Sequence, residues 1–250
     1  MTDATLASAL ATEAGEFLLR LRAAGDLSPE ELRTRGDAGS QEVLARRLAE
    51  EVPSDAVLSE EARDSAARLS ASRVWIIDPL DGTREYGEGR SDWAVHVALW
   101  VDGELAAGAV AIPAEGITLD TAFPLPRPRP ADRIRLAVSR SRPPAFVAAL
   151  AEQLDAELVP MGSAGVKATA VLRGQVDAYV HAGGQYEWDS AAPVAVARAA
   201  GLHTSRIDGS PLVYNRPDPL LPDLVVALPE VAARVLTAVS SVELEEVSAR

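Results

Sequence analysis

Residues 74–83 read Val-Trp-Ile-Ile-Asp-Pro-Leu-Asp-Gly-Thr, an apolar run followed by two aspartates. The four apolar residues at its start predict a short buried strand. Asp78 and Asp81 come next, three residues apart, at a turn that Pro79 stiffens. We therefore expect the two carboxylates to converge where this strand ends.

Paired carboxylates at a strand end suit a hard cation. Mg²⁺ takes oxygen ligands and keeps several waters, so a few carboxylates, a backbone carbonyl and a phosphate can complete its shell. An ordinary turn in which Asp81 caps the next helix explains the same spacing. The spacing alone leaves both interpretations open.

Gly82 and Thr83 complete the motif at its C-terminal end. If a helix begins here, its free amides and its dipole favour a phosphate group, and Gly82 permits a close approach. For Thr83, the alternative is a hydroxyl that only caps the helix.

Bulk composition limits the class of protein. At 250 residues and 48% hydrophobic content, the chain can bury a substantial core, as one large domain or two packed lobes. The absence of cysteine excludes disulfides, thiolate catalysis and zinc-thiolate sites, and suits a reducing compartment.

Residues 1–22 predict an amphipathic helix and not a signal peptide, and no run reaches membrane-spanning length. We expect a cytoplasmic protein without a membrane partner.

The net charge of −13 argues against a nucleic-acid partner, because such binding depends on Lys and Arg neutralising phosphates. If the substrate is nonetheless a phosphate, bound metal ions must supply the positive charge that it meets.

The order of predicted elements indicates layers of helices and sheets. Helical spacing covers residues 6–21 and 43–48, and short strands are expected at 56–58 and 74–77. Asp102-Gly103 predicts a hairpin between strands at 93–99 and 105–112. The Pro-rich residues 124–130 predict a connector, after which strands and helices alternate. We expect an α+β (α/β layered) fold, with an N-terminal α+β lobe at 1–125 and a C-terminal α/β lobe at 126–250.

Two further acidic segments lie far from Asp78 in sequence. Ser59-Glu60-Glu61 comes after a predicted strand, and Glu187-Trp188-Asp189 precedes an Ala-rich helix. Taken alone, the first is a pair of solvated first-turn acids and the second a helix N-cap.

Together, these three acidic motifs, in this order, resemble the inositol monophosphatase superfamily of magnesium-dependent, lithium-sensitive phosphatases. The resemblance covers nearly the whole chain and implies an αβαβα sandwich. Residues 162–167 (Gly-Ser-Ala-Gly-Val-Lys), 177–179 and 187–192 resemble its CysQ branch, which hydrolyses adenosine 3',5'-bisphosphate in sulfur assimilation.

The resemblance implies two to three Mg²⁺ ions per site. Their ligands would be Glu60, Asp78, the Leu80 carbonyl, Asp81 and Asp189. Residues 34–37 (Thr-Arg-Gly-Asp) match a family element that makes Asp37 the partner of Thr83 in activating the attacking water, with Glu60 also catalytic. The alternative for Asp37 is the N-cap of the helix that runs through Leu44.

The resemblance also implies the substrate contacts. These are Gly82, Thr83, Ser139, Arg140, Gly162, Ser163, Lys167, His181 and Asp189. Lys167 is the only lysine of the chain, and the alternative for it is a solvated helix residue. His181 replaces an arginine common in such nucleotide phosphatases, so discrimination for a bisphosphate is expected to be looser. His96 and His203 are expected to be packing residues.

Two other functions stay open. One is the hydrolysis of inositol 1-phosphate or fructose 1,6-bisphosphate by an enzyme of the same superfamily. The other is a catalytically silent protein that binds metal or phosphate. A homodimer is expected from the resemblance alone.

Overall fold

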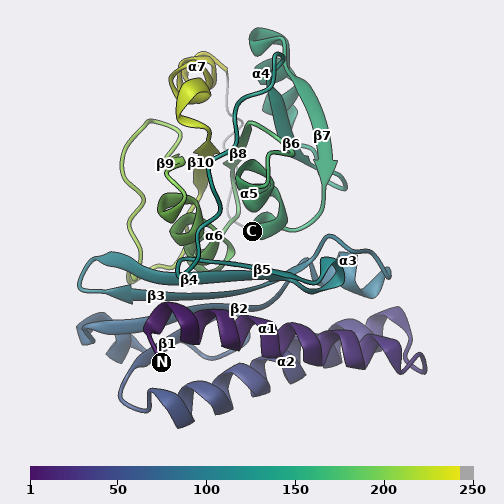
Figure 1. Ribbon diagram of the computed structural model, residues 1–250, viewed down its shortest axis with the longest axis vertical. Helices are drawn as coiled ribbons and strands as arrows, with labels where there is room; N and C mark the ends of the chain where they lie inside the picture. Colours follow the sequence, from purple (N-terminus) through teal and green to yellow (C-terminus); the bar gives the residue numbers. More distant parts are fainter. Residues whose placement is uncertain (243–250) are drawn as a thin grey trace.

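The chain forms five layers, helix–sheet–helix–sheet–helix, in a computed structural model that describes residues 1–242 (Figure 1). Helices α1 (Asp3–Ala23) and α2 (Pro29–Glu51) form the first layer. A five-stranded sheet, the helices α5 and α6, a second five-stranded sheet, and the helices α4 and α7 come next in that order. This arrangement confirms the predicted αβαβα sandwich.

The outer helix α2 is longer than the apolar spacing predicts. It begins at Pro29, where Ser28 and Glu31 form a reciprocal capping box. Asp37 therefore lies within the helix, which contradicts the alternative in which Asp37 is its N-cap. The helix presents Leu44 and Leu48 to the first sheet, as the spacing predicts.

The first sheet has the order β1-β2-β3-β4-β5. Its strands are β1 (Ala56–Ser59), β2 (Arg73–Asp81), β3 (Ala94–Val101), β4 (Glu104–Ile112) and β5 (Ile117–Asp120). Strand β2 is buried on both faces: Trp75 and Ile77 face α1 and α2, while Val74 and Ile76 face the inner helices. This double burial explains its continuous apolar run. The hairpin at Asp102-Gly103 is confirmed.

A β-bulge in β2 determines how its two acids point. Asp78 pairs with His96 and Asp81 with Ala94, so three residues of β2 oppose two of β3. In a regular strand, residues three apart would face opposite sides of the sheet. The extra residue brings Asp78 and Asp81 to the same side. The strand thus continues through Asp81, beyond the expected end at Ile77.

The Pro-rich residues 124–130 carry the chain from β5 to the second sheet, as predicted. That sheet has the order β7-β6-β8-β10-β9. Its strands are β6 (Arg135–Ser139), β7 (Glu157–Met161), β8 (Ala178–Ala182), β9 (His203–Ser205) and β10 (Asp223–Ala227). Helices α4 (Ala145–Leu154) and α7 (Pro229–Ser240) cover its outer face.

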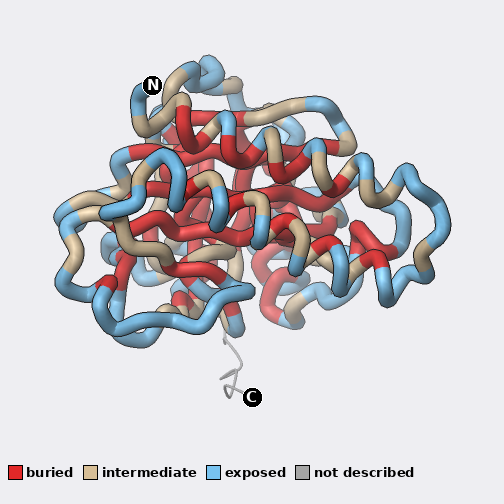
Figure 2. The backbone as a smooth tube through the Cα atoms, turned by 90° about the horizontal axis from the view of Figure 1, so that it is seen from below, coloured by how far each residue is buried: buried red, intermediate tan, exposed pale blue. Residues whose placement is uncertain are grey.

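The inner helices α5 (Ala164–Leu172) and α6 (Glu187–Ala199) lie between the two sheets. Helix α6 packs so closely on β4 that a Cβ atom on Gly108 would lie 2.6 Å from the Cβ of Ala195. Buried residues of both inner helices and both sheets belong to one hydrophobic cluster, and Figure 2 shows that buried backbone is concentrated in the interior of the molecule. The inner helices therefore bring residues of the second half to the strand ends of the first. The division into lobes at residue 125 stays a prediction.

No helix within residues 1–242 has both the length and the apolar character needed to cross a membrane.

Candidate active site and metal centre

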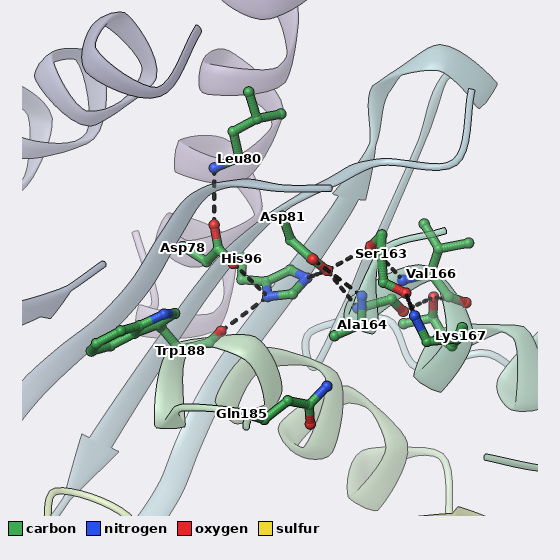
Figure 3. A network of polar contacts seen from close by, with 12 residues as sticks. Asp78, Leu80, Asp81, His96, Ser163, Ala164, Val166, Lys167, Gln185 and Trp188 are labelled. Atoms are coloured by element: carbon green, nitrogen blue, oxygen red, sulfur yellow. Dashed lines mark hydrogen bonds and ion pairs between the residues drawn. The ribbon is translucent and has the colours of Figure 1, made fainter. Parts of the chain in front are cut away.

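The functional residues gather where the end of β2 meets the first turns of α5 and α6 (Figure 3). Asp78 and Asp81 come from β2 and Asp189 from α6. Glu60 comes directly after β1, which runs parallel to β2, so both strands deliver acids at the same edge of the sheet. The structure thus brings together acids that are more than a hundred residues apart in sequence.

Asp81 is held by the N-terminus of α5. Its carboxylate accepts hydrogen bonds from the Ser163 hydroxyl at 2.5 Å and from the Gly165 and Ala164 amides at 2.6 and 3.1 Å. Burial alone would raise the pKa of Asp81, but His96, Ser163 and the amides hold it well below its ordinary value. Asp81 is therefore a carboxylate at neutral pH.

His96 belongs to this site, although its apolar surroundings in the sequence predict a packing residue. The ring is completely buried on β3, and its Nε2 atom lies 3.2 Å from Oδ2 of Asp81. Its Nδ1 atom lies 3.0 Å from the carbonyl oxygen of Trp188. Burial would lower the pKa of His96, but Asp81 and this carbonyl raise it above the ordinary value. His203, in contrast, bonds Ser205 on the edge strand β9.

The remaining carboxyl groups of the site repel one another when they are ionised. Burial and the charges of Glu60 and Asp81 raise the pKa of Asp78 well above its usual range. Desolvation and Asp189 raise the pKa of Glu60 to about 7, although Glu60 is exposed at the rim. Desolvation and Asp81 raise the pKa of Asp189 to about 7, and Asp189 also caps α6 through the Tyr186 amide. A bound cation would stabilise the ionised form of these carboxylates by neutralising their charge.

These residues fit a metal ion. Asp78, Asp81 and His96 each offer a ligand atom, and these atoms lie within 4.8 Å of one another. Carboxylate oxygens are the ligands of hard divalent cations, and the raised pKa values mark negative charge that the surrounding protein leaves uncompensated. The cluster is therefore a metal-binding site.

Asp37 and Thr83 are also brought together, as expected. The Thr83 hydroxyl lies 3.2 Å from Oδ1 of Asp37 and 3.0 Å from the Leu80 carbonyl oxygen. Its single proton can go to only one of these acceptors at a time. Desolvation and the charge of Glu61 raise the pKa of Asp37 to about 7. Thr83 starts the short helix α3 (Thr83–Gly87), with Gly82 at φ 87° before it.

A pocket of about 450 Å³ opens next to the acids, at the ends of β6 and β8. Of the predicted substrate contacts, Ser139, Lys167 and His181 line it. Lys167 is only 7% exposed and its ammonium donates to the Ser163 carbonyl at 2.5 Å, which excludes the alternative of a solvated helix residue. Tyr179, Gln185 and Arg142 also line the pocket, although they are not among the predicted substrate contacts.

Three other predicted substrate contacts make hydrogen bonds within the protein. Arg140 turns to Asp92, with Nη1 and Oδ2 2.5 Å apart, and is absent from the pocket lining. The Gly162 amide donates to the same carboxylate at 2.6 Å. The Ser163 hydroxyl donates to Asp81.

A hydrogen-bond network around the buried Arg68, which the sequence did not predict, holds the loop that follows Glu60. Arg68, in the 3₁₀ turn Ala66–Ser70, is 1% exposed and donates to Asn215 Oδ1 at 2.7 Å and to the Arg216 carbonyl at 2.8 Å. The Asn215 and Arg216 amides donate in turn to Glu187 at 2.6 and 2.8 Å. The loop after β1 is thereby tied to the start of α6.

The five-layer fold thus holds a carboxylate cluster that can bind a divalent cation. Comparison with known proteins gives the family: the chain belongs to the inositol monophosphatase family, which matches residues 3–243.

Several curated relatives match nearly the whole chain. A "3'-phosphoadenosine 5'-phosphate phosphatase" of Mycobacterium leprae (strain TN) is 49% identical, covering 97% of this chain and 95% of its own. The protein of the same name in Mycobacterium tuberculosis (strain CDC 1551 / Oshkosh) is 51% identical over 91% and 90%. Among solved structures, CysQ from Bacteroides thetaiotaomicron has a TM-score of 0.79 at 26% identity, covering 90% and 96%.

Proposed function

We propose that this protein is a magnesium-dependent phosphatase that removes the 3'-phosphate of adenosine 3',5'-bisphosphate, giving AMP and phosphate. The sulfated form of that nucleotide is a second substrate, and the reaction serves sulfur assimilation. The observation that carries the proposal is a pocket of about 450 Å³, holding the only lysine of the chain, directly beside the carboxylate cluster. Relatives of about 50% identity named for this substrate support it.

The carboxylates are the proposed metal ligands. Glu60, Asp78 and the Leu80 carbonyl would hold one Mg²⁺, while Asp78, Asp81 and Asp189 would hold a second; Glu60 orients a third. Bound Mg²⁺ neutralises phosphate charge and lowers the pKa of coordinated water. The Leu80 amide donates to Oδ1 of Asp78 at 3.0 Å, which leaves Oδ2 for a cation.

Asp37 and Thr83 form the proposed general-base pair. Because Asp37 has a pKa of about 7, it can accept a proton near neutral pH and release it again. The Thr83 hydroxyl can pass its own proton to Asp37 while it accepts one from the attacking water.

The substrate is proposed to lie between the acids and the pocket. Lys167 is close enough to Asp81 and Asp189 for their charges to act on it, so its ammonium can neutralise a phosphate oxygen at the boundary of cluster and pocket. Gly82 and Thr83 present backbone at the end of β2. The homodimer and the cytoplasmic location stay predictions.

A panel of substrates tests this function. With Mg²⁺ present, phosphate release from adenosine 3',5'-bisphosphate, inositol 1-phosphate and fructose 1,6-bisphosphate is measured as kcat/KM. We expect the nucleotide to be preferred by at least about tenfold, which corresponds to about 1.4 kcal/mol of transition-state binding. A preference for either sugar phosphate would replace the nucleotide assignment. No release with any of them would favour a silent binding protein.

A further inference from the structure

The pocket beside the metal centre holds two cationic side chains, Lys167 and Arg142, among its lining residues. A nucleotide 3',5'-bisphosphate carries one phosphate that reacts and one that does not. If the proposed function holds, the second phosphate also needs a partner of opposite charge. The position of that partner determines whether the enzyme distinguishes a bisphosphate from a monophosphate.

His181 lines the pocket but cannot serve as that partner. Its Nε2 atom contacts the Gly183 carbonyl, which only accepts hydrogen bonds, so the proton of the neutral ring is committed there. Burial, together with the charge of Lys167, lowers the pKa of His181 to about 4. At neutral pH the ring is uncharged, and its other nitrogen, Nδ1, has no proton to donate to a phosphate oxygen.

Lys167 is held by contacts within the protein. Its Nζ atom donates to the Ser163 carbonyl at 2.5 Å and lies 5.5 Å from the centre of the Tyr179 ring. The charges that act on its ammonium include those of Asp81 and Asp189 at the metal centre, together with those of Glu85 and Asp92. Lys167 therefore meets the phosphate that reacts.

Arg142 is exposed at the mouth of the same pocket. Its backbone amide donates to the Ser139 hydroxyl at 3.2 Å, which anchors the chain at the end of β6. Within residues 1–242, its guanidinium has no ion-pair partner, whereas the nearby Arg140 pairs with Asp92. A guanidinium fork matches a phosphate with two parallel hydrogen bonds. We propose that Arg142 binds the phosphate that is not hydrolysed and thereby determines specificity for bisphosphates.

Two substrates and three variants test this inference, which rests on the proposed function. Adenosine 3',5'-bisphosphate and adenosine 3'-monophosphate differ only in the second phosphate. Arg142→Gln should lower kcat/KM for the bisphosphate about 10- to 100-fold, the value of a charge-assisted hydrogen bond. The loss should lie mainly in KM, because the contact exists before and during reaction. For the monophosphate the change should stay below about threefold.

The controls separate binding from structure. Arg142→Lys keeps the charge without the fork, so it should restore part of the loss. Arg133→Gln removes a charge from a surface ion pair with Asp155, 2.9 Å long and outside the pocket, and should alter neither substrate. The Mg²⁺-dependent rise in melting temperature should be the same in all three variants.

The possible outcomes are distinct. If the unmodified protein prefers the bisphosphate and Arg142→Gln keeps that preference, the inference is wrong while the proposed function stands. Equal losses for both substrates indicate a structural role and also overturn it. If the unmodified protein does not prefer the bisphosphate, the proposed function itself fails.

Discussion

Asp81 and His96 are in contact at the centre of the site, with Oδ2 and Nε2 3.2 Å apart. The other ring nitrogen faces the Trp188 carbonyl at 3.0 Å. Both ring nitrogens thus face an oxygen atom, that of the Asp81 carboxylate on one side and that of the Trp188 carbonyl on the other. His96 therefore links the carboxylate of β2 to the first turn of α6, where Asp189 lies.

His96→Asn should weaken metal binding. The shorter amide can still donate to the Trp188 carbonyl, but it loses the contact with Asp81. We expect the Mg²⁺ concentration for half-maximal rise in melting temperature to increase by about tenfold, as is typical for partners of metal ligands. His203→Asn, on the edge strand β9, is the control. An unchanged midpoint in His96→Asn would show that Asp81 needs no such support.

Asp78→Asn should lower kcat by about 1,000-fold, equivalent to about 4 kcal/mol of lost electrostatic stabilisation. In the presence of a chelator the same variant should melt at a higher temperature, because it removes a buried charge that its neighbours repel. Asp102→Asn, at an exposed turn with φ 45° that suits Asn equally well, should change neither quantity. Near-native turnover in Asp78→Asn would contradict the metal-ligand assignment.

The chelated protein should become less stable as pH rises from about 4 to 8. Asp37, Glu60 and Asp189 each have a pKa of about 7 in the folded state, against about 4 when unfolded. In this window the folded state binds more protons than the unfolded state, so the free energy of unfolding falls with pH. The low pKa of Asp81 acts in the opposite sense below about pH 4, and the pKa of His181, lowered to about 4 from an ordinary 6.5, offsets about one of the three acids between those values.

Melting temperatures measured with a chelator at pH 5 and pH 7.5 test this dependence. We expect the value at pH 7.5 to be lower by several degrees and to recover on addition of Mg²⁺, which binds the folded state. A melting temperature that rises with pH in the chelator would contradict the charge repulsion within the cluster.

Arg68→Met should destabilise the protein by about 3 kcal/mol, because it leaves the buried Asn215 side chain without its donor and also removes the bonds to Asp64 and the Arg216 carbonyl. Urea unfolding measures this loss. The Mg²⁺ midpoint should also rise, since the loop after Glu60 loses its tie to α6. Arg20→Met, whose surface ion pair with Glu16 is 3.6 Å long, should change stability by less than about 0.5 kcal/mol.

The acidic motifs could be found from the sequence because their residue types are unusual at strand ends. Their arrangement could not. The spacing of Asp78 and Asp81 does not reveal a bulge, since a turn explains it equally well. His96 becomes a site residue only because it is the register partner of Asp78, and a strand sequence carries no sign of its register.

Other elements differ in how much signal they carried. The capping box of Ser28 and Glu31, with Pro29 at the first helical position, was available as a start signal for α2. Residues 139–142 resemble a Ser-Arg-Ser-His element of the CysQ branch, with Arg142 in place of the histidine, but this match does not say which arginine faces the pocket. Asp92, about fifty residues earlier, accepts the guanidinium of one, and such a distant partner leaves no local pattern. The hydrogen bond between Arg68 and Asn215 joins residues that are 147 positions apart, so it likewise leaves no local pattern in the sequence.

The bulge in β2 has a consequence for how mutations can affect the site. It leaves Pro79 and Leu80 out of the pairing with β3, so their carbonyls accept the hydroxyls of Ser40 and Thr83 instead. The Leu80 oxygen proposed as a metal ligand is therefore a main-chain atom, which every amino acid carries. No codon change at position 80 can delete it, whereas the loss of one residue from the strand would return it to the ladder. This part of the site is vulnerable to insertions and deletions, and its neighbouring aspartates to substitutions.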